Sequence, residues 1–210
     1  MNKLKTLALA TCLSFVASVA SAEVRMGVSV HAMMFESTGS ETLRTSGNVT
    51  NTSIDETAIV PSVFIETMNS DGLGVGIDYV PVAELGSGSS TNKVDAETNG
   101  ENKASAELAS HATLYVIAQH ENGVFVKAGM AFADVETTES LSTGDTYGDA
   151  TTEGLMAGIG MSRDLDNGMF VRGELSYVDY DDISITSTGG STVKADVDST
   201  NVTFSIGKSF

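Results

Sequence analysis

The sequence predicts an all-β fold: a single-domain, eight-stranded antiparallel up-and-down transmembrane β-barrel. Two observations support this prediction. Apolar and polar residues alternate along eight stretches of about ten residues, the length at which a tilted strand crosses a bilayer. Short turns and long polar segments connect these stretches in strict alternation, so all the long connections lie at one end of the barrel.

The N-terminus has the pattern of a signal peptide. Lys3 and Lys5 precede an apolar run, and Ala20-Ser21-Ala22 forms a small-residue cleavage site. The apolar run is shorter than the ~20 residues of a membrane-spanning helix. We therefore expect export and cleavage before Glu23. The predicted domain organisation is a signal peptide at residues 1–22 and a barrel domain at residues 23–210.

The mature chain is strongly acidic. After residue 22 the sequence holds 28 acidic and nine basic residues, which leaves a net charge of −19. Such a charge disfavours nucleic acid or anionic lipid as a partner. No later stretch reaches 18 consecutive apolar residues, so an integral protein with this sequence has to be a closed barrel.

The elements follow one another in a regular order. We predict strands at residues 24–35, 58–67, 73–82, 107–119, 124–135, 151–163, 169–180 and 199–210. Gly-containing polar clusters predict three short turns, at residues 69–72, 121–123 and 165–168. Segments rich in Ser, Thr, Asn and Gly predict four long loops, at residues 36–57, 83–106, 136–150 and 181–198. Pro61 cannot donate to a strand ladder and predicts a bulge, and alternation places Leu108 on the outer face.

The last predicted strand carries the clearest pattern. Its apolar residues share one face: Val202, Phe204, Ile206 and the terminal Phe210. This strand resembles the final strand of bacterial outer-membrane β-barrels, which commonly ends in Phe and is read by the insertion machinery. The sequence departs from that pattern at Lys208, where an aromatic residue is usual. An outward lysine near the end of the strand can still reach the headgroup level.

The resemblance extends over the whole mature chain. It is to the small eight-stranded outer-membrane barrels of the OmpA transmembrane-domain and OmpX type, and residues 125–129 and 172–177 are in the style of that family's strands. It implies an integral, monomeric protein of the outer membrane without a cofactor. Its expected partners are outer-membrane lipid, lipopolysaccharide and, through the final strand, the assembly machinery.

The charged residues on inward faces are the candidate functional residues. The predicted polar network of the lumen consists of Arg25, Glu66, Asp78, His111, Tyr115, Lys127, Arg172 and Glu174. Its three cations and three carboxylates balance, as buried charges must if none is to remain unpaired. Because an eight-stranded barrel is just wide enough to be filled by side chains, we interpret this set as a packed polar interior. A narrow polar path is the alternative.

Catalytic and metal sites have weaker support. Ser110 and His111 are adjacent and therefore point to opposite faces, and no nucleophile–base pair with a third orienting group is apparent. The acidic segment 136–150 suggests a divalent-cation site, but its spacing is not that of a calcium loop. A solvated acidic fringe explains it better. We therefore predict neither an enzyme nor a metal site.

Together these features predict a structural or surface-interactive protein with acidic extracellular loops. The first alternative is a small porin-like channel for ions or small solutes, and a distant one is an outer-membrane lipid-modifying enzyme. Electrical conductance separates the first two functions.

Overall fold

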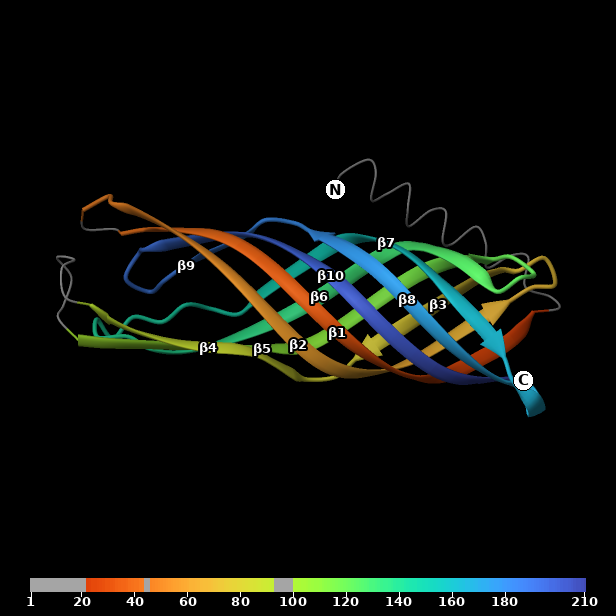
Figure 1. Ribbon diagram of the computed structural model, residues 1–210. Coiled ribbons are helices and arrows are strands. Elements are labelled where there is room, and N and C mark those ends of the chain that lie inside the picture. Colours follow the sequence, from red (N-terminus) through yellow and green to blue (C-terminus); the bar gives the residue numbers. More distant parts are fainter. Residues whose placement is uncertain (1–21, 44–45, 93–99) are drawn as a thin grey trace.

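The computed structural model describes residues 22–43, 46–92 and 100–210, and the described residues form one antiparallel sheet closed into a barrel (Figure 1). The predicted signal peptide lies outside the described residues, apart from Ala22. The strands are β1 (Glu23–Thr42), β2 (Val49–Met68), β3 (Leu73–Val80), β4 (Ala83–Asn92), β5 (Gly100–Gln119), β6 (Val124–Ser140), β7 (Ala150–Asp164), β8 (Met169–Tyr180), β9 (Ile183–Thr186) and β10 (Thr192–Ser209). A short 3₁₀ turn, η2, covers Asp166–Gly168. Within these ranges, no helix is long and apolar enough to cross a membrane.

The ten described strands occupy eight strand positions around the barrel. β3 and β4 both pair with β5, one after the other, and β8 and β9 both pair with β10 in the same way. Each of these two pairs occupies one strand position, which is briefly interrupted. Between β3 and β4 the interruption contains Pro81, which cannot donate to a ladder. The prediction of an eight-stranded antiparallel barrel is thus confirmed.

The first and last strands close the barrel. β1 and β10 pair in continuous register from Arg25↔Ser209 to Thr42↔Thr192. Following the paired residues once around the wall from Arg25 leads back to β1 at Phe35, so the shear is ten residues. In a barrel of eight strand positions with this shear, the strands tilt by roughly 40° from the barrel axis. The interior of such a barrel is narrow enough to be filled by side chains.

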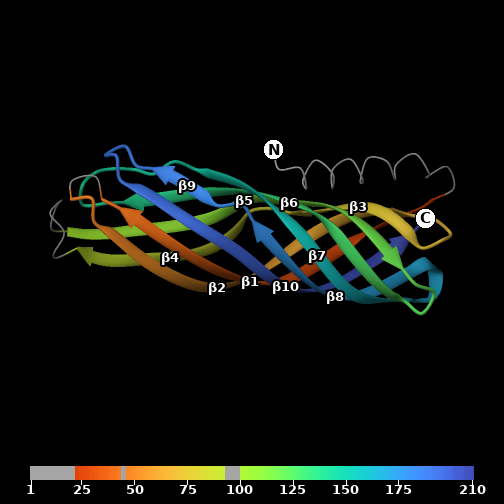
Figure 2. The same cartoon turned by 90° about the horizontal axis from the view of Figure 1, so that it is seen from above.

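The strands are longer than a membrane crossing needs. At this tilt each residue adds about 2.5 Å of height, so a 20-residue strand such as β1 rises about 50 Å, against about 25 Å for the apolar band of outer-membrane barrels. On β1 the apolar outer face runs from Val24 to Met34, and Glu36 follows it. Figures 1 and 2 show that long strands, β1, β2 and β10 among them, extend to the end of the barrel opposite the C-terminus.

Three of the four predicted long loops, at residues 36–57, 83–106 and 181–198, are therefore largely strand, and their predicted bounds are wrong. In the fourth, at residues 136–150, residues 141–149 lie outside the strands. β1 and β2, for example, enclose only residues 43–48 instead of 36–57. The polar segments do not alternate because both of their faces lie outside the apolar band. Alternation marks the part of a strand that lies in lipid, whereas Thr and Val still favour strand where both faces are polar.

Two local predictions are also wrong. The register of β1 with β2 runs through Pro61 without a shift, and β3 pairs with β2 only from Val63 onward, so no bulge is needed. Register shifts occur instead in β4, between Glu84 and Gly86, and in β5, between Leu108 and Ser110. The shift in β5 is a bulge that affects an inward face. The extra residue reverses the alternation there, and Leu108 points into the barrel, where it is 3% exposed.

Candidate functional site

The candidate functional site is the interior of the barrel, which changes character along its axis. On β1 the inward residues include, in order from the turn end, Arg25, His31 and Met33. On β8 they include Arg172 and, further from the turn end, Val178. Three layers result. The charged layer, at the turn end, contains Arg25, Glu66, Lys127, Arg172 and Glu174 with the rings of Phe64, Tyr115, Phe125 and Phe170. The polar layer follows and contains His31, Ser62, Asp78, Thr113, Ser176 and Thr203. The apolar layer contains Met33, Ala58, Val60, Val80, Leu108, Ala133, Met156 and Val178.

An ion pair anchors the charged layer. Arg172 Nη2 donates to Glu66 Oε1 at 2.6 Å, and Arg172 Nη1 donates to Glu66 Oε2 at 3.0 Å. Tyr115 Oη also donates to Glu66 Oε2, at 2.8 Å. Arg172 is 3% exposed and Glu66 1% exposed, so the pair is out of contact with bulk solvent. Paired, hydrogen-bonded geometry of this kind is what buried charges require.

Aromatic rings fill the space around the guanidinium of Arg172. Its Cζ lies 5.0 Å from the ring centroid of Phe125 and 5.2 Å from that of Phe170. Glycines on the neighbouring strands make room for these rings, since Gly160 is the cross-strand partner of Phe125 and Gly207 that of Phe170. A Cβ on Gly160 would lie 2.3 Å from Phe125 Cζ, and one on Gly207 would lie 2.4 Å from Phe170 Cζ. The charged layer is therefore a packed plug of cations, carboxylates and rings.

A second ion pair lies next to the first. Lys127 Nζ is 2.6 Å from Glu174 Oε2, and both side chains are largely buried. The same ammonium group lies 4.3 Å from the ring centroid of Tyr115, within the range of a cation–π interaction. Tyr115 thus contacts both pairs, through its hydroxyl group to Glu66 and through its ring to Lys127.

The polar layer contains a hydrogen-bonded chain. Ser62 Oγ donates to Asp78 Oδ2 at 2.9 Å and lies 2.8 Å from His31 Nε2. The same imidazole nitrogen is 3.4 Å from Asp78 Oδ1. On the far side of the ring, His31 Nδ1 is 2.9 Å from Thr203 Oγ1. The chain therefore joins β3, β2, β1 and β10.

The eight predicted site residues all face the interior, but they belong to separate clusters. Asp78 contacts Ser62 and His31 and forms none of the hydrogen bonds or ion pairs of the charged layer. Arg25 Nη1 donates to Gln119 Oε1 at 3.3 Å, and His111 Nε2 lies 3.0 Å from Tyr180 Oη. The sequence prediction missed His31, Ser62, Thr203 and the three phenylalanine rings of the charged layer. The position of His31 on the inward face of β1 was the available signal.

The expectation of a lumen that is polar throughout is wrong for its outer part. Met33, Val60 and Val178 are each 2% exposed and belong to one apolar cluster inside the barrel. Alternation identifies an inward face but does not predict that its residues change from charged to apolar along the axis.

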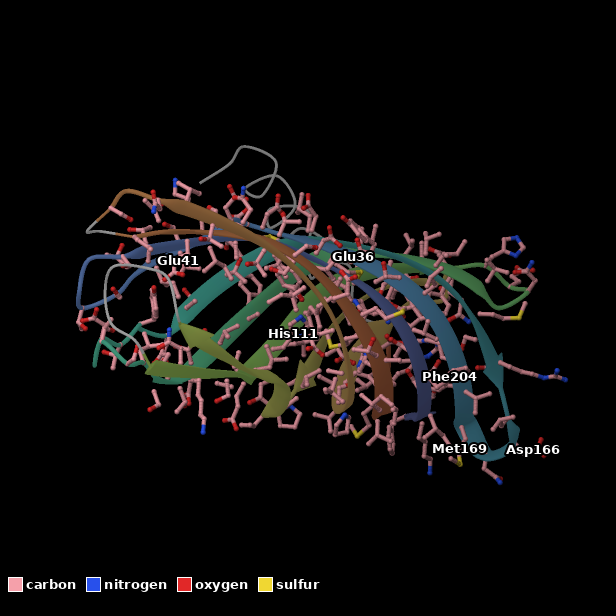
Figure 3. The ribbon with its side chains drawn as sticks, turned by 60° about the vertical axis from the view of Figure 1, so that its left-hand side comes forward. Glu36, Glu41, His111, Asp166, Met169 and Phe204 are labelled. Carbon is pink, nitrogen blue, oxygen red and sulfur yellow. The ribbon has the colours of Figure 1, made fainter. Side chains whose placement is uncertain are left out.

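A segment crosses the outer end of the barrel. Residues 141–149, which we term the strap, connect β6 to β7. Tyr147 Oη in the strap donates to Glu41 Oε1 of β1 at 2.9 Å. β6 and β7, which the strap connects, are four and three strands from β1 around the wall, so this hydrogen bond crosses part of the mouth. Thr146 N also donates to Thr188 Oγ1, at 3.1 Å. Figure 3 shows Glu41 at the extended end and Asp166 and Met169 at the opposite, turn end.

The residues predicted as an insertion signal lie on the outer face. Phe204 is 70% exposed and Phe210 67% exposed, and Val202 and Ile206 point to the same side. Figure 3 shows Phe204 on this part of the wall. The backbones of Phe210 and Val24 exchange two hydrogen bonds, which continue the closure of the barrel.

Catalytic and metal-binding arrangements have little basis in this geometry. Ser110 Oγ donates to Asp134 at 2.7 Å, whereas His111 points inward to Tyr180, so the two neighbours do not form a pair. Among the described residues, no three His, Cys, Asp or Glu side chains gather in a way that could hold a metal ion.

The closed sheet, the apolar outer wall and the filled interior define a transmembrane β-barrel. The chain belongs to the family described as outer membrane protein beta-barrel domain, which it matches over residues 6–210. Membership of this family places the protein in the outer membrane. A search of curated proteins found no match to the chain.

Solved structures of outer-membrane proteins resemble the chain. OprG from Pseudomonas aeruginosa is 13% identical, with a TM-score of 0.50 over 88% of this chain and 96% of OprG. Ail from Yersinia pestis, in complex with the heparin analogue sucrose octasulfate, is 11% identical, with a TM-score of 0.46 over 90% of this chain and 99% of Ail. The outer membrane protease OmpT from Escherichia coli is 10% identical, with a TM-score of 0.45 over 90% and 97%. At 13% identity and a TM-score of 0.50, the likeness to OprG shows the fold alone.

Proposed function

We propose that the protein is a closed, non-conducting barrel that stabilises the outer membrane and presents its acidic outer end to the surroundings. The observation that carries this proposal is the buried Arg172–Glu66 pair, whose guanidinium group is packed among aromatic rings and fills the interior at the turn end. The apolar layer supports it independently, because a constriction lined by groups such as Met33 and Val178 disfavours the passage of ions and water.

A surface role accounts for the length of the strands. The outer face beyond the apolar band carries acidic side chains, among them Glu36, Asp179 and Asp198. The strap is hydrogen-bonded across the mouth, so the outer end presents an ordered surface. We propose that this acidic surface faces lipopolysaccharide and the medium.

Conductance across a planar bilayer tests the closed state. We expect the refolded mature chain to give no current steps at physiological salt, although a mobility shift on boiling demonstrates that it has folded. The Arg163→Ala variant removes an exposed arginine and serves as a control that should stay silent. Steady current through the unaltered protein would overturn the proposal and favour the alternative of a small channel.

An enzymatic role is not part of this proposal. Ser62, His31 and Asp78 are in contact, as a nucleophile, a base and an acid would be, but Ser62 is 3% exposed and lies beneath the apolar layer. A lipid substrate has no route to this hydroxyl group. Turnover of a lipid ester that is lost in both His31→Ala and Ser62→Ala would contradict this view.

We also propose that Val202, Phe204, Ile206 and Phe210 contact lipid and the insertion machinery. Their exposure supports this role, since apolar groups on an outer wall are stable only against lipid. The Phe210→Ala variant should reach the membrane more slowly, measured as the heat-modifiable fraction in cells. Phe210→Leu is the matched control that keeps an apolar side chain. Equal rates for all three proteins would exclude a role of this side chain in insertion.

The N-terminal residues 1–22 complete the proposal as a cleaved signal peptide. N-terminal sequencing of the protein from outer membranes should begin at Glu23. A mature protein that retains Lys3 and Lys5 would contradict it.

A further inference from the structure

A cavity separates the charged layer from the apolar layer. It offers about 40 Å³ to the centres of water molecules and is bounded by side chains of both ion pairs and of the Asp78–His31 chain. Asn201 of β10 and His111 of β5 also line it, and these two strands are four strand positions apart around the barrel. The cavity is therefore surrounded by the whole barrel wall. Figure 3 shows His111 within the barrel.

Three residues that line this cavity carry a buried polar atom with no hydrogen-bond partner among the described residues. One atom is the donor Arg172 Nε, and the other two are His111 Nδ1 and Asn201 Oδ1, on residues that are 5% and 4% exposed. The other polar atoms of the His111 and Asn201 side chains are engaged, since His111 Nε2 contacts Tyr180 Oη and Asn201 Nδ2 donates to Ser199 Oγ. Buried polar groups in proteins are nearly always hydrogen-bonded, by ordered water if by no protein atom. The free atoms of His111 and Asn201 therefore indicate a ligand that forms hydrogen bonds.

The charges around the cavity indicate that this ligand is neutral. Arg172 is paired with Glu66, and Lys127 is paired with Glu174. The remaining carboxylate, Asp78, accepts a hydrogen bond from Ser62 and lies beside His31. Both cations are thus matched by carboxylates, and the carboxylate of Asp78 is held by Ser62 and His31. Asn201 Oδ1 needs a donor, and His111 Nδ1 needs a donor or an acceptor according to the tautomer of the ring. Water satisfies both atoms.

We propose that the cavity is an internal hydration site in which about three water molecules bridge His111 Nδ1, Asn201 Oδ1 and the polar layer. A water molecule needs about 10–15 Å³ of such volume, so the size of the cavity sets this number. The plug lies on one side of these molecules and the apolar layer on the other, so both layers restrict their path to the medium. Their exchange with bulk water is consequently slow.

Water–protein cross-relaxation in the nuclear magnetic resonance spectrum of the refolded, isotope-labelled barrel tests this site. We expect cross-peaks between water and the carbon-bound ring protons of His111, with the sign typical of long-lived water. Asn201→Leu removes one of the two atoms and fills part of the cavity, so these cross-peaks should weaken at least twofold. Thr200→Val, which alters the outward neighbour on the same strand, is the matched control and should leave them unchanged.

Several outcomes would overturn the proposal. An absence of cross-peaks in the unaltered protein would mean that the cavity is dry. Cross-peaks that persist in Asn201→Leu at full strength would mean that they are relayed from the hydroxyl group of Tyr180. Ring signals of His111 that move when sodium is exchanged for potassium would identify an ion site instead. If Asn201→Leu fails to show the mobility shift of a folded barrel, Asn201→Val, with a smaller side chain, answers the same question.

Discussion

Arg172 and Glu66 lie 106 residues apart in the sequence, yet their side chains meet inside the barrel through two hydrogen bonds, of 2.6 and 3.0 Å. They belong to β8 and β2, which β10 and β1 separate in the sheet. The pair therefore joins two walls that share no backbone hydrogen bonds. Tyr115 Oη, from β5, adds a third wall. A buried pair of this kind fixes the arrangement of the strands only while both partners are present.

Arg172→Ala should destabilise the barrel strongly. The substitution leaves the carboxylate of Glu66 buried without its cation, and breaking a buried pair in this way costs about 3–5 kcal/mol. We expect a lower urea midpoint for the protein refolded in detergent. Because the chain contains no tryptophan, circular dichroism or the mobility shift on boiling is the appropriate measurement.

Two further variants separate the loss of charge pairing from the loss of packing. Arg163→Ala, at an exposed position of β7, should shift the midpoint little. Replacing both partners together, as Arg172→Met with Glu66→Leu, should recover most of the stability, since an apolar pair of similar volume needs no partner. A double variant as unstable as Arg172→Ala would mean that the pair acts through its shape instead of its charge.

Gly160→Ala should also lower the free energy of unfolding, for a steric reason. A Cβ at this position would lie 2.3 Å from Phe125 Cζ and 2.3 Å from the carbonyl oxygen of Gly173, so the ring or the wall has to move. Overpacking of this kind typically costs about 1–3 kcal/mol. Gly173→Ala is the matched control, because its nearest neighbour, Phe204 Cε1, is 3.8 Å away. Equal urea midpoints for the two variants would show that Phe125 does not pack against this wall.

The sequence predicted that the charged residues on the inward faces form a balanced network, but it did not assign the individual pairs. Alternation alone identified Glu66 and Arg172 as inward residues, since it depends only on period two. Their pairing depends on the ten-residue shear, which is a property of the closed sheet. In the same way, the alternation that placed His31 inward gave no sign that Ser62 and Asp78 would lie beside it.

The ends of the strands were less predictable for a physical reason. Between Glu36 and Thr57 neither face borders lipid, so the sequence loses the alternation that distinguishes strand from loop. The bulge in β5 was equally hidden, because one extra residue reverses the pattern without a glycine or proline to mark it. Leu108 was consequently assigned to the wrong face.

A row of four carboxylates on the outer face yields a third prediction. Asp55, Glu36, Asp198 and Asp179 are successive cross-strand partners on β2, β1, β10 and β8. Like charges directly opposite one another are destabilising, by roughly 0.2–1 kcal/mol for each pair. Glu36→Gln removes repulsion toward two neighbours and should raise the urea midpoint at low salt. The gain should shrink at 1 M salt, where the screening length is about 3 Å.

Glu56→Gln provides the comparison for this effect. Glu56 is exposed on the neighbouring strand, and its partner on β1 is the uncharged Phe35. Its substitution should change the midpoint little at either salt concentration. If Glu36→Gln lowers the stability, the row interacts with something other than itself, and the repulsion argument fails.

The strap gives the last prediction, which concerns local opening. Tyr147→Phe removes the hydroxyl group that donates to Glu41 across the mouth, whereas the hydrogen bonds between Thr146 and Thr188 remain. Loss of one hydrogen bond of about 0.5–1.5 kcal/mol corresponds to an increase of about twofold to tenfold in the open population. Chymotrypsin still cleaves after Phe, so cleavage within residues 141–149 should accelerate by this factor. Tyr79→Phe, on the outer face of β3, should not change the rate. An unchanged rate for Tyr147→Phe would mean that the strap is held by its remaining contacts alone, and that the bond across the mouth contributes nothing to its closure.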